Sequence, residues 1–306
     1  MNKPAALKKT DDKSYDRLKK FLLVLLFISP ALFFYGTFNL IGIVRTFYYS
    51  FMRWKGISAS RTFIGLENYI RLLSDSLFWN SLKNNFILVI VSIFIQLPGA
   101  LILALLVNSK IKGTRFFRTV YFMPMLLSTV ATGIMWVLFY DPNFGLLAKL
   151  IDILGLKVNK SFLQGSSALP SILFVICWQY IPFYMIIVRA GMTNIPESLY
   201  EAAKIDGANG WKIFWTVTLP LLVPTLRSAA VLQLVGSLKY FDLFYVMMGG
   251  SPNQYTELMA TYMYKKGFTE FQMGYASAIA GYMFLICLIL AIAFLYITRG
   301  REENYG

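Results

Sequence analysis

Residues 194–220 read NIPESLYEAAKIDGANGWKIFWTVTLP, a short polar segment between two long apolar runs. Pro196 and Glu197 suit the first turn of a helix, one through its fixed φ and the other through its charge. Gly207 is a favourable stop after Asp206. A helix over 196–206 is roughly 16 Å long, which is too short to cross a bilayer. We expect a second short helix over 209–216, after which Leu219-Pro220 turns the chain back into the membrane.

The faces of this helix indicate a protein partner. Ala202 and Ala203 are small enough to let another surface approach closely, while Glu201 and Asp206 offer carboxylates to basic or backbone donors. These features favour a helix that docks in a groove. The alternative is a helix lying on the lipid surface, but such helices prefer basic residues. This helix has three acidic residues, Glu197, Glu201 and Asp206, and one basic residue, Lys204.

The rest of the chain predicts an all-α membrane protein. Of its 306 residues 57% are hydrophobic and 14% are charged, against about 25% charged residues in soluble domains. The charge is missing from runs of about 20 residues, the length that a spanning helix needs. We expect six spans, near 21–50, 86–107, 120–140, 170–192, 219–246 and 275–298. The alternative, an apolar soluble enzyme, rarely has so many long uncharged runs.

Lysine and arginine predict the orientation. Residues 1–20 and the short loop 108–119 are densely basic, and both lie on the same side of the predicted spans. Positive charge concentrates in cytoplasmic loops, so both termini should be cytoplasmic. The basic start also resembles a signal peptide, but its apolar run is too long and no small-residue cleavage site follows.

Composition excludes several classes of function. There are no histidines, which removes Ser-His-Asp catalysis and histidine zinc sites. Cys177 and Cys287 lie in apolar runs, so we expect both to be buried side chains without a disulfide or metal. No GxxxxGK[ST] or GxGxxG motif is present, so we expect no cofactor on this chain. The net charge of +14 lies between the apolar runs, which argues against a nucleic-acid partner.

The runs are rich in helix breakers: Pro30, Pro98, Pro124, Pro182, Pro220 and Pro224. Proline removes one helix hydrogen bond and kinks the helix. In a membrane the freed carbonyl needs a partner, so kinks occur where neighbouring helices or water supply one. Kinked spans suit a protein that alternates between states, although proline is common in membrane helices.

A longer pattern within 194–220 resembles the EAA motif, the hallmark of permease subunits of binding-protein-dependent ABC importers. The motif falls in the last predicted cytoplasmic loop, where that family has it. The residues that carry the resemblance are Glu201, Ala202, Ala203, Asp206, Gly207 and Ala208, followed twelve positions later by Pro220 of a Leu-Pro pair.

Four further stretches resemble the carbohydrate-uptake branch of this family. Residues 63–86 are similar to its first external loop, and 113–124 to its basic loop before the third span. Residues 143–155 resemble an external turn, with Ala148-Lys149 where asparagine is common. Residues 241–256 resemble the first permease of sugar and glycerol-phosphate systems, except that Gly-Gly-Ser-Pro replaces Gly-Gly directly before proline.

The resemblance implies a type I ABC importer permease fold in a bacterial plasma (inner) membrane. It implies a basic segment 1–20, a first span and external loop 21–83, a permease core 84–298 with its EAA loop at 194–220, and a tail 299–306. It implies a second permease, two ATPases that hold ATP and Mg and receive the EAA helix, and an extracytoplasmic solute-binding protein. The seven motif residues would couple ATPase closure to the switching of the permease pair.

Sugar sites combine aromatic faces with amides and carboxylates. Polar side chains at membrane depth are costly and often functional, although aromatics also form interfacial belts. Lys239 and Asp242 are three residues apart, a spacing at which they pair on a helix. The candidates for the substrate pathway are Trp136, Trp178, Gln179, Tyr180, Gln233, Lys239, Tyr240 and Asp242.

Three other functions stay open at this point. Within the importer class the solute is alternatively glycerol phosphate, phosphate or a peptide, and phosphate favours arginine in the pathway. Arg45 and Arg227 are the arginines near membrane depth, but both lie near span ends, where side chains snorkel. A secondary transporter needs intramembrane carboxylates or paired broken repeats, and Asp242 is the one acid near a span interior. A scaffold or receptor subunit is the third alternative.

Overall fold

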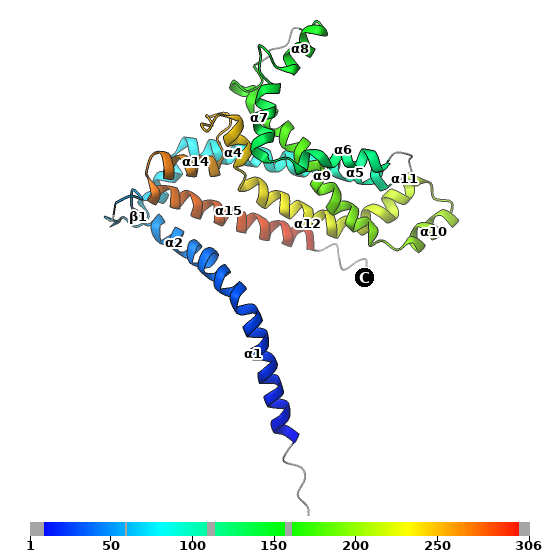
Figure 1. Ribbon diagram of the computed structural model, residues 1–306, viewed down its shortest axis with the longest axis horizontal. Coiled ribbons are helices and arrows are strands. Elements are labelled where there is room, and N and C mark those ends of the chain that lie inside the picture. Colours follow the sequence, from blue (N-terminus) through cyan, green and yellow to red (C-terminus); the bar gives the residue numbers. More distant parts are fainter. Residues whose placement is uncertain (1–8, 59, 109–113, 157–160, 300–306) are drawn as a thin grey trace, which may run out of the picture.

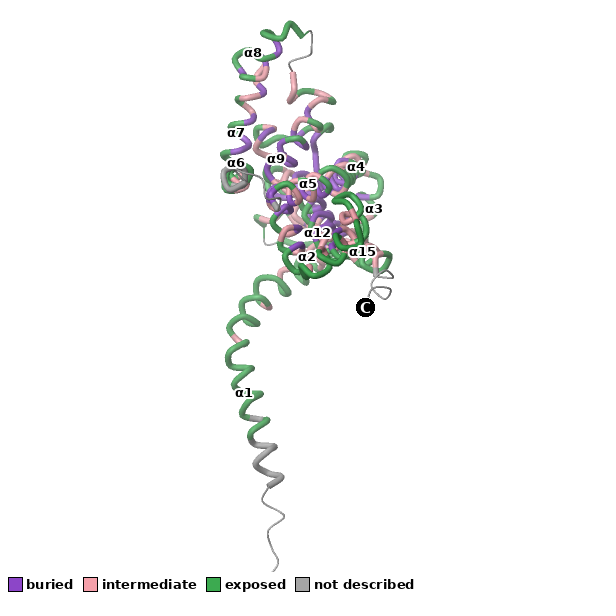
Figure 2. The backbone as a smooth tube through the Cα atoms, turned by 90° about the vertical axis from the view of Figure 1, so that its right-hand side faces the viewer, coloured by how far each residue is buried: buried purple, intermediate pink, exposed green. Residues whose placement is uncertain are grey.

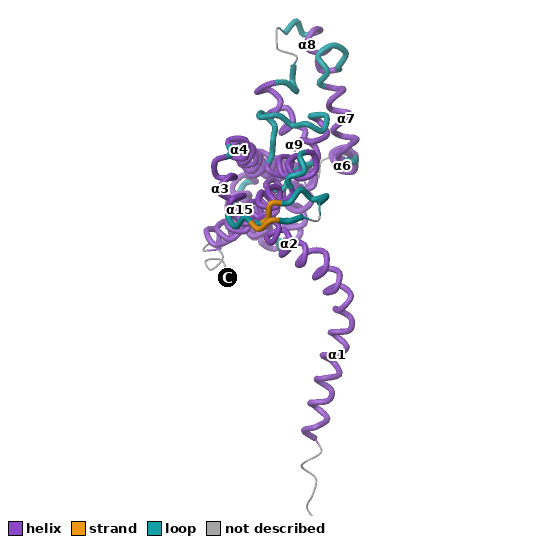
Figure 3. Tube along the Cα trace, turned by 90° about the vertical axis from the view of Figure 1, so that its left-hand side faces the viewer, coloured by secondary structure: helices purple, strands orange, loops and turns teal. Residues whose placement is uncertain are grey.

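The computed structural model describes residues 9–58, 60–108, 114–156 and 161–299. Within these ranges the regular structure is helical apart from one two-stranded antiparallel ribbon, drawn in orange in Figure 3. The first eight residues of the predicted basic segment 1–20, residues 109–113 of the predicted basic loop, and the predicted tail from residue 300 lie outside the described residues.

The first half of the chain forms α1 (Lys9–Tyr35), α2 (Ile41–Ser50), β1 (Met52–Arg53), β2 (Thr62–Phe63), α3 (Glu67–Ser74), α4 (Ser76–Val91), α5 (Leu97–Asn108), α6 (Thr114–Leu126), α7 (Thr129–Phe139) and α8 (Leu146–Ile153). The second half forms α9 (Ala168–Thr193), α10 (Glu197–Ile205), α11 (Gly210–Ile213), α12 (Leu219–Leu238), α13 (Asp242–Met247), α14 (Met259–Tyr264) and α15 (Met273–Arg299). π-Helical turns at Gly36–Leu40, Ser92–Gln96, Phe214–Thr218 and Lys265–Thr269 join helices without a break.

Five helical stretches of the described residues are long and apolar enough to cross a membrane: Lys19–Ser50, Ser76–Val107, Gly165–Thr193, Gly210–Met247 and Met273–Thr298. Each contains one of the predicted spans. The stretches Ser76–Val107 and Gly210–Met247 begin about ten residues earlier than predicted, because Asp75 and Asn209 cap first turns that hydropathy does not detect. Their side chains accept hydrogen bonds from the free N–H groups of those turns.

The third predicted span, 120–140, is not one straight helix. Residues Thr119–Leu126 and Thr129–Phe139 meet at 103°, so the described chain has six spans only if this bent pair is one of them. The backbone of Ser128 is extended, with ψ of 136°, and its carbonyl starts the next helix by accepting from Thr132. Pro124 lies one turn before the corner and weakens the first helix there.

The predicted turn at Leu219-Pro220 is wrong. α11 continues through the π-helical turn Phe214–Thr218 into α12, so the predicted second short helix is the first part of the long stretch Gly210–Met247. Pro220 has no N–H to offer a carbonyl in the preceding turn. A π-helical turn shifts the hydrogen-bond register and accommodates that missing donor. The same arrangement recurs at Pro98, which follows the π-helical turn Ser92–Gln96.

The core lies where α4, α5, α9, α12 and α15 pack together (Figures 1 and 2). Three buried clusters share these helices: one joins α4, α12, α14 and α15, one joins α4, α7, α9 and α13, and one joins α5, α9 and α12. α4, α9 and α12 each belong to two clusters. A displacement of any of these helices would therefore change contacts in two of the three clusters.

Two parts of the chain extend beyond this core. In Figure 2 residues 19–35 of α1 are almost entirely exposed and run away from the body, while α7 and α8 project on the opposite side. No residue in the most apolar part of Lys19–Ser50 is buried. Figure 1 places the β1–β2 ribbon and α14 at one end of the helical body and α10 at the other. These ends carry the two surfaces described below.

Candidate functional site

A polar cavity of about 340 Å³ lies among α4, the following π-helical turn, α9, α12 and α13. We call it the central cavity. It brings together five of the eight predicted pathway residues: Tyr180, Gln233, Lys239, Tyr240 and Asp242. The other lining residues are Leu88, Ser92, Gln96, Ile176, Tyr184, Gly236, Ser237 and Phe241.

Two glutamines from different helices form the polar centre of this cavity. Gln233 Nε2 donates to Gln96 Oε1 at 3.1 Å, and Gln96 Nε2 donates to the carbonyl of Ile176 at 3.3 Å. Both side chains are buried, at 2% exposure each. Gln233 Oε1 has no hydrogen-bond partner. A buried acceptor without a partner is costly, and this one belongs to a side chain that lines the cavity.

Hydroxyl groups surround the amide pair. Ser92 and Ser237 share a hydrogen bond of 3.0 Å between their Oγ atoms, linking α12 to the π-helical turn after α4. The rings of Tyr180 and Tyr240 meet edge to face, with centroids 6.1 Å apart. The hydroxyl of Tyr240 is buried without a hydrogen-bond partner. The cavity thus combines aromatic surface with several polar groups.

Lys239 and Asp242 lie on the rim and do not form an ion pair within the described residues. The predicted helical pairing fails because the helix is interrupted between them. Lys239 ends α12, Phe241 is non-helical at φ of −139°, and Asp242 starts α13. Both charged residues are exposed. The cavity entrance therefore carries one charge of each sign.

The remaining three predicted pathway residues do not line the cavity. Trp136 is 9% exposed and belongs to the cluster of α4, α7, α9 and α13, where its ring lies 5.4 Å from that of Trp178. Gln179 is buried at 3% exposure. It sits next to Tyr180 in sequence, but a helix turns successive residues about 100° apart, so only one of them faces the cavity.

Sequence reasoning missed Ser92, Gln96, Tyr184 and Ser237. A detectable signal existed for Gln96, a glutamine inside the predicted span 86–107, because amides at membrane depth are costly and often functional. The serines give no such signal, since serine is common at helix contacts in membranes. Only the packing of α12 against α4 brings Ser92 and Ser237 together.

Asn85 fixes the position of the cavity wall. Its Nδ2 donates to the carbonyls of Ser237 at 2.8 Å and Leu238 at 3.3 Å, and its Oδ1 accepts from the backbone N–H of Met259 at 2.9 Å. The side chain is fully buried. One amide on α4 therefore binds two carbonyls at the end of α12 and the first N–H of α14.

The second candidate site is α10 with the turn after it. Gly207 has φ of +74°. Its N–H donates to the carbonyl of Lys204 at 3.0 Å, and that of Ala208 donates to Ala203 at 2.9 Å. This pair of bonds is the Schellman motif, which satisfies carbonyls at a helix end and needs a left-handed residue. The predicted helix and its stop are confirmed within one residue.

The predicted motif residues mostly form an exposed surface. Glu201, Ala202, Asp206 and Gly207 are exposed, whereas Ala203, Ala208 and Pro220 are partly buried. Ile205, an apolar side chain that is 86% exposed, lies on the same helix and was not among the predicted coupling residues. A single exposed apolar side chain is common on protein surfaces, but here it lies one helical turn after the exposed Glu201 and next to the exposed Asp206.

α10 is connected to the cavity through α12. The hydroxyl of Thr218, in the π-helical turn before α12, donates to that of Tyr200 on α10 at 3.4 Å. The same α12 helix carries Gln233 and Ser237 of the central cavity. No group of three or more metal-ligand side chains occurs within the described ranges.

Residues 74–302 match the model of a protein family described as "Binding-protein-dependent transport system inner membrane component". Among curated proteins, a probable ABC transporter permease protein of Pyrococcus horikoshii is 37% identical, over 92% of this chain and 97% of that protein. The multiple sugar-binding transport system permease protein MsmF of Streptococcus mutans is 31% identical, over 92% of this chain and 95% of MsmF.

A similar fold occurs in a bacterial alginate ABC transporter, solved in complex with an alginate pentasaccharide-bound periplasmic protein. The TM-score is 0.82 over 93% of this chain and 96% of that one, at 22% sequence identity. At this identity the comparison shows the fold alone. The predicted type I ABC importer permease fold is confirmed.

Proposed function

The chain belongs to the family of inner-membrane components of binding-protein-dependent transport systems, and we propose that it forms half of the pathway through which an ATP-driven importer takes up a carbohydrate. Permeases named for sugar transport are among its relatives. The observation that carries the proposal is the central cavity, where two glutamines, two serines and three tyrosines from four segments converge. Amides and hydroxyls bind sugar hydroxyls, and aromatic rings bind sugar faces.

The charge of the cavity favours a neutral solute. Its described lining contains one cation, Lys239, and one anion, Asp242, and no arginine. Phosphate is most often bound by arginine forks or several basic groups. Glycerol phosphate is therefore the less favoured solute. The unpaired Gln233 Oε1 supports a hydroxyl donor on the solute instead.

We further propose that α10 docks in a groove on an ATPase subunit. The exposed carboxylates, the small alanines and Ile205 form the contact surface. The bond from Thr218 to Tyr200 and the unbroken path into α12 then give a mechanical route from the ATPase to Gln233. ATP and Mg bind the ATPase pair, a second permease completes the pathway, and both termini of this chain are cytoplasmic.

The proposal is tested in the assembled importer, reconstituted in liposomes with its ATPases, second permease and solute-binding protein. Uptake of a panel of radiolabelled sugars, glycerol phosphate and peptides identifies the solute class. Gln233→Leu removes both polar atoms and leaves an apolar side chain one atom shorter, so uptake of the preferred sugar should fall about tenfold or more. Gln179→Leu, outside the cavity lining, is the matched control. Uptake of phosphate esters but not sugars contradicts the proposed solute.

A further inference from the structure

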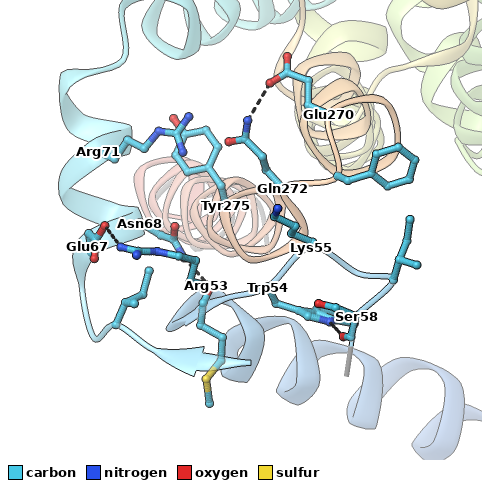
Figure 4. Close-up of a pocket in the computed structure, with 14 residues that line it drawn as sticks. Arg53, Trp54, Lys55, Ser58, Glu67, Asn68, Arg71, Glu270, Gln272 and Tyr275 are labelled. Carbon is cyan, nitrogen blue, oxygen red and sulfur yellow. Dashed lines mark hydrogen bonds and ion pairs between the residues drawn. The ribbon is translucent and has the colours of Figure 1, made fainter. Parts of the chain in front are cut away.

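A second and larger cavity, of about 760 Å³, lies at the end of the molecule opposite α10 (Figures 1 and 4). We call it the ribbon cavity. Its walls are the loop of the β1–β2 ribbon, α3, and the segment 270–275 at the start of α15. It shares no lining residue with the central cavity. A ligand held here is therefore off the proposed solute pathway.

Two cations in the ribbon cavity have no acidic partner. Arg53 pairs with Glu67 at 2.6 Å, and Glu270 pairs with Lys266 at 2.8 Å. Lys55 and Arg71 line the cavity and form no ion pair within the described residues. The guanidinium of Arg71 lies over the ring of Tyr275, 4.2 Å from its centroid. This contact orients Arg71 and leaves its hydrogen-bonding groups available.

Segment 270–272 adds an apolar knob and an unsatisfied amide. Phe271 is the one non-glycine residue with positive φ among those described, at 53°, and its side chain is 46% exposed. Holding a bulky residue there is unfavourable, and such strain clusters at binding sites. Gln272 Nε2 donates to Glu270 at 3.0 Å, but its buried Oε1 has no partner. Figure 4 shows Gln272 between Glu270 and Lys55.

The walls are rigid before any partner binds. The N–H of Gly274 donates to the carbonyl of Trp54 at 3.1 Å, which fixes the ribbon loop to α15. Asn68 on α3 donates to the carbonyls of Ser50 and Met52 at 2.8 and 3.0 Å. A preformed cavity loses little conformational entropy on binding. The hydrogen bonds that hold these walls therefore favour a cavity to which a partner binds without rearrangement of the ribbon loop.

We propose that the ribbon cavity receives an acidic side chain from the extracytoplasmic solute-binding protein, with Lys55 and Arg71 as the receiving cations and Phe271 as the adjoining apolar contact. The inference rests on the proposed function, because it takes the end opposite α10 as extracytoplasmic. Lys55 and Arg71, which have no acidic partner among the described residues, are complementary in charge to a surface carboxylate, and the exposed ring of Phe271 is complementary to apolar residues beside that carboxylate. Such complementary charges act mainly on specificity and association rate.

The test measures the Kd of the sugar-loaded solute-binding protein for the complete importer in nanodiscs. The double variant Lys55→Gln with Arg71→Gln should raise Kd about tenfold and weaken its salt dependence. The basal ATP hydrolysis of the importer alone should stay unchanged. Lys83→Gln, an exposed lysine outside the cavity lining, is the control. A Kd within about twofold of wild type in the double variant overturns the inference.

Phe271→Gly separates docking from misfolding. It removes the exposed ring and also relieves the backbone strain, since glycine adopts positive φ freely. The relieved strain offsets part of the lost ring packing, so the variant should still fold and assemble and should bind the solute-binding protein more weakly. Unchanged affinity contradicts the assigned role of the ring. If the wild-type importer takes up no carbohydrate, the proposed function fails, whereas normal uptake with unchanged Kd in every cavity variant defeats this inference alone.

Discussion

Replacing Gly207 by alanine tests whether the turn after α10 transmits force to the membrane helices. Gly207 has φ of +74°, and an added Cβ would meet no atom of the chain within 4 Å. The cost of alanine within this chain is therefore conformational rather than steric. A left-handed L-residue costs about 1–2 kcal/mol, which lowers the population of the intact Schellman turn roughly 5- to 30-fold relative to its frayed form.

The open space around Gly207 also gives a matched control. Asparagine tolerates the left-handed region far better than alanine does, so Gly207→Asn preserves the turn but adds bulk on the exposed surface. If the turn geometry alone matters, Gly207→Asn should work nearly normally and Gly207→Ala poorly. If an ATPase surface approaches the glycine closely, both variants should fail.

The assay is solute-stimulated ATP hydrolysis together with uptake in liposomes, after quantifying the assembled complex. The expected result for Gly207→Ala is a fall of uptake by about fivefold or more, with uptake falling more than ATP hydrolysis because the two become uncoupled. Uptake and stimulated hydrolysis at wild-type rates in both variants, with normal assembly, would refute the assignment of α10 as the coupling helix.

Three further predictions concern stability and the cavity wall. Asn85→Leu removes hydrogen bonds to two carbonyls and one N–H, so it should lower the free energy of unfolding by about 3 kcal/mol or more. The measurement is the Tm in detergent. The control is Asn80→Leu, which removes one hydrogen bond and should lower the Tm much less. Trp136→Phe removes a buried N–H that has no partner and does not line the cavity, so the KM for uptake should stay at the wild-type value. For Asp75, burial raises the pKa, but hydrogen bonds from Tyr262, Tyr275 and two backbone N–H groups outweigh it and hold the pKa below the ordinary value of 3.8. Its stabilising contribution is therefore complete above that value and is lost as pH falls through the folded pKa, so the Tm difference between wild type and Asp75→Asn should shrink from pH 6 to pH 3.

The Asp75 carboxylate shows why part of this fold resists prediction. Its Oδ1 caps α4 locally, accepting from the N–H groups of Leu77 and Phe78, two and three residues away. Its Oδ2 accepts from Tyr262 and Tyr275, both at 2.5 Å, from positions nearly 200 residues later. The first role belongs to a recognisable N-cap. The second depends on how α14 and α15 pack.

The sequence by itself determined the membrane class, the approximate spans and the ends of α10. These features rest on interactions over a few residues: apolar runs, an acidic first turn, and a glycine that accepts the left-handed conformation. It also predicted a single third span over 120–140 and a turn at Pro220, and the structure has a 103° corner within that span and a continuous helix at Pro220. Hydropathy measures how apolar a segment is and contains no information on its direction.

Only the tertiary structure decided which polar residues share a cavity. Gln96 and Gln233 are 137 positions apart and hydrogen bond because α12 packs between α4 and α9. Trp136 and Gln179 looked equally suitable by residue type, yet they face the helix contacts rather than the cavity. A side chain's direction depends on the rotation of its helix against its neighbours, and that rotation is fixed by the packing of all three helices together.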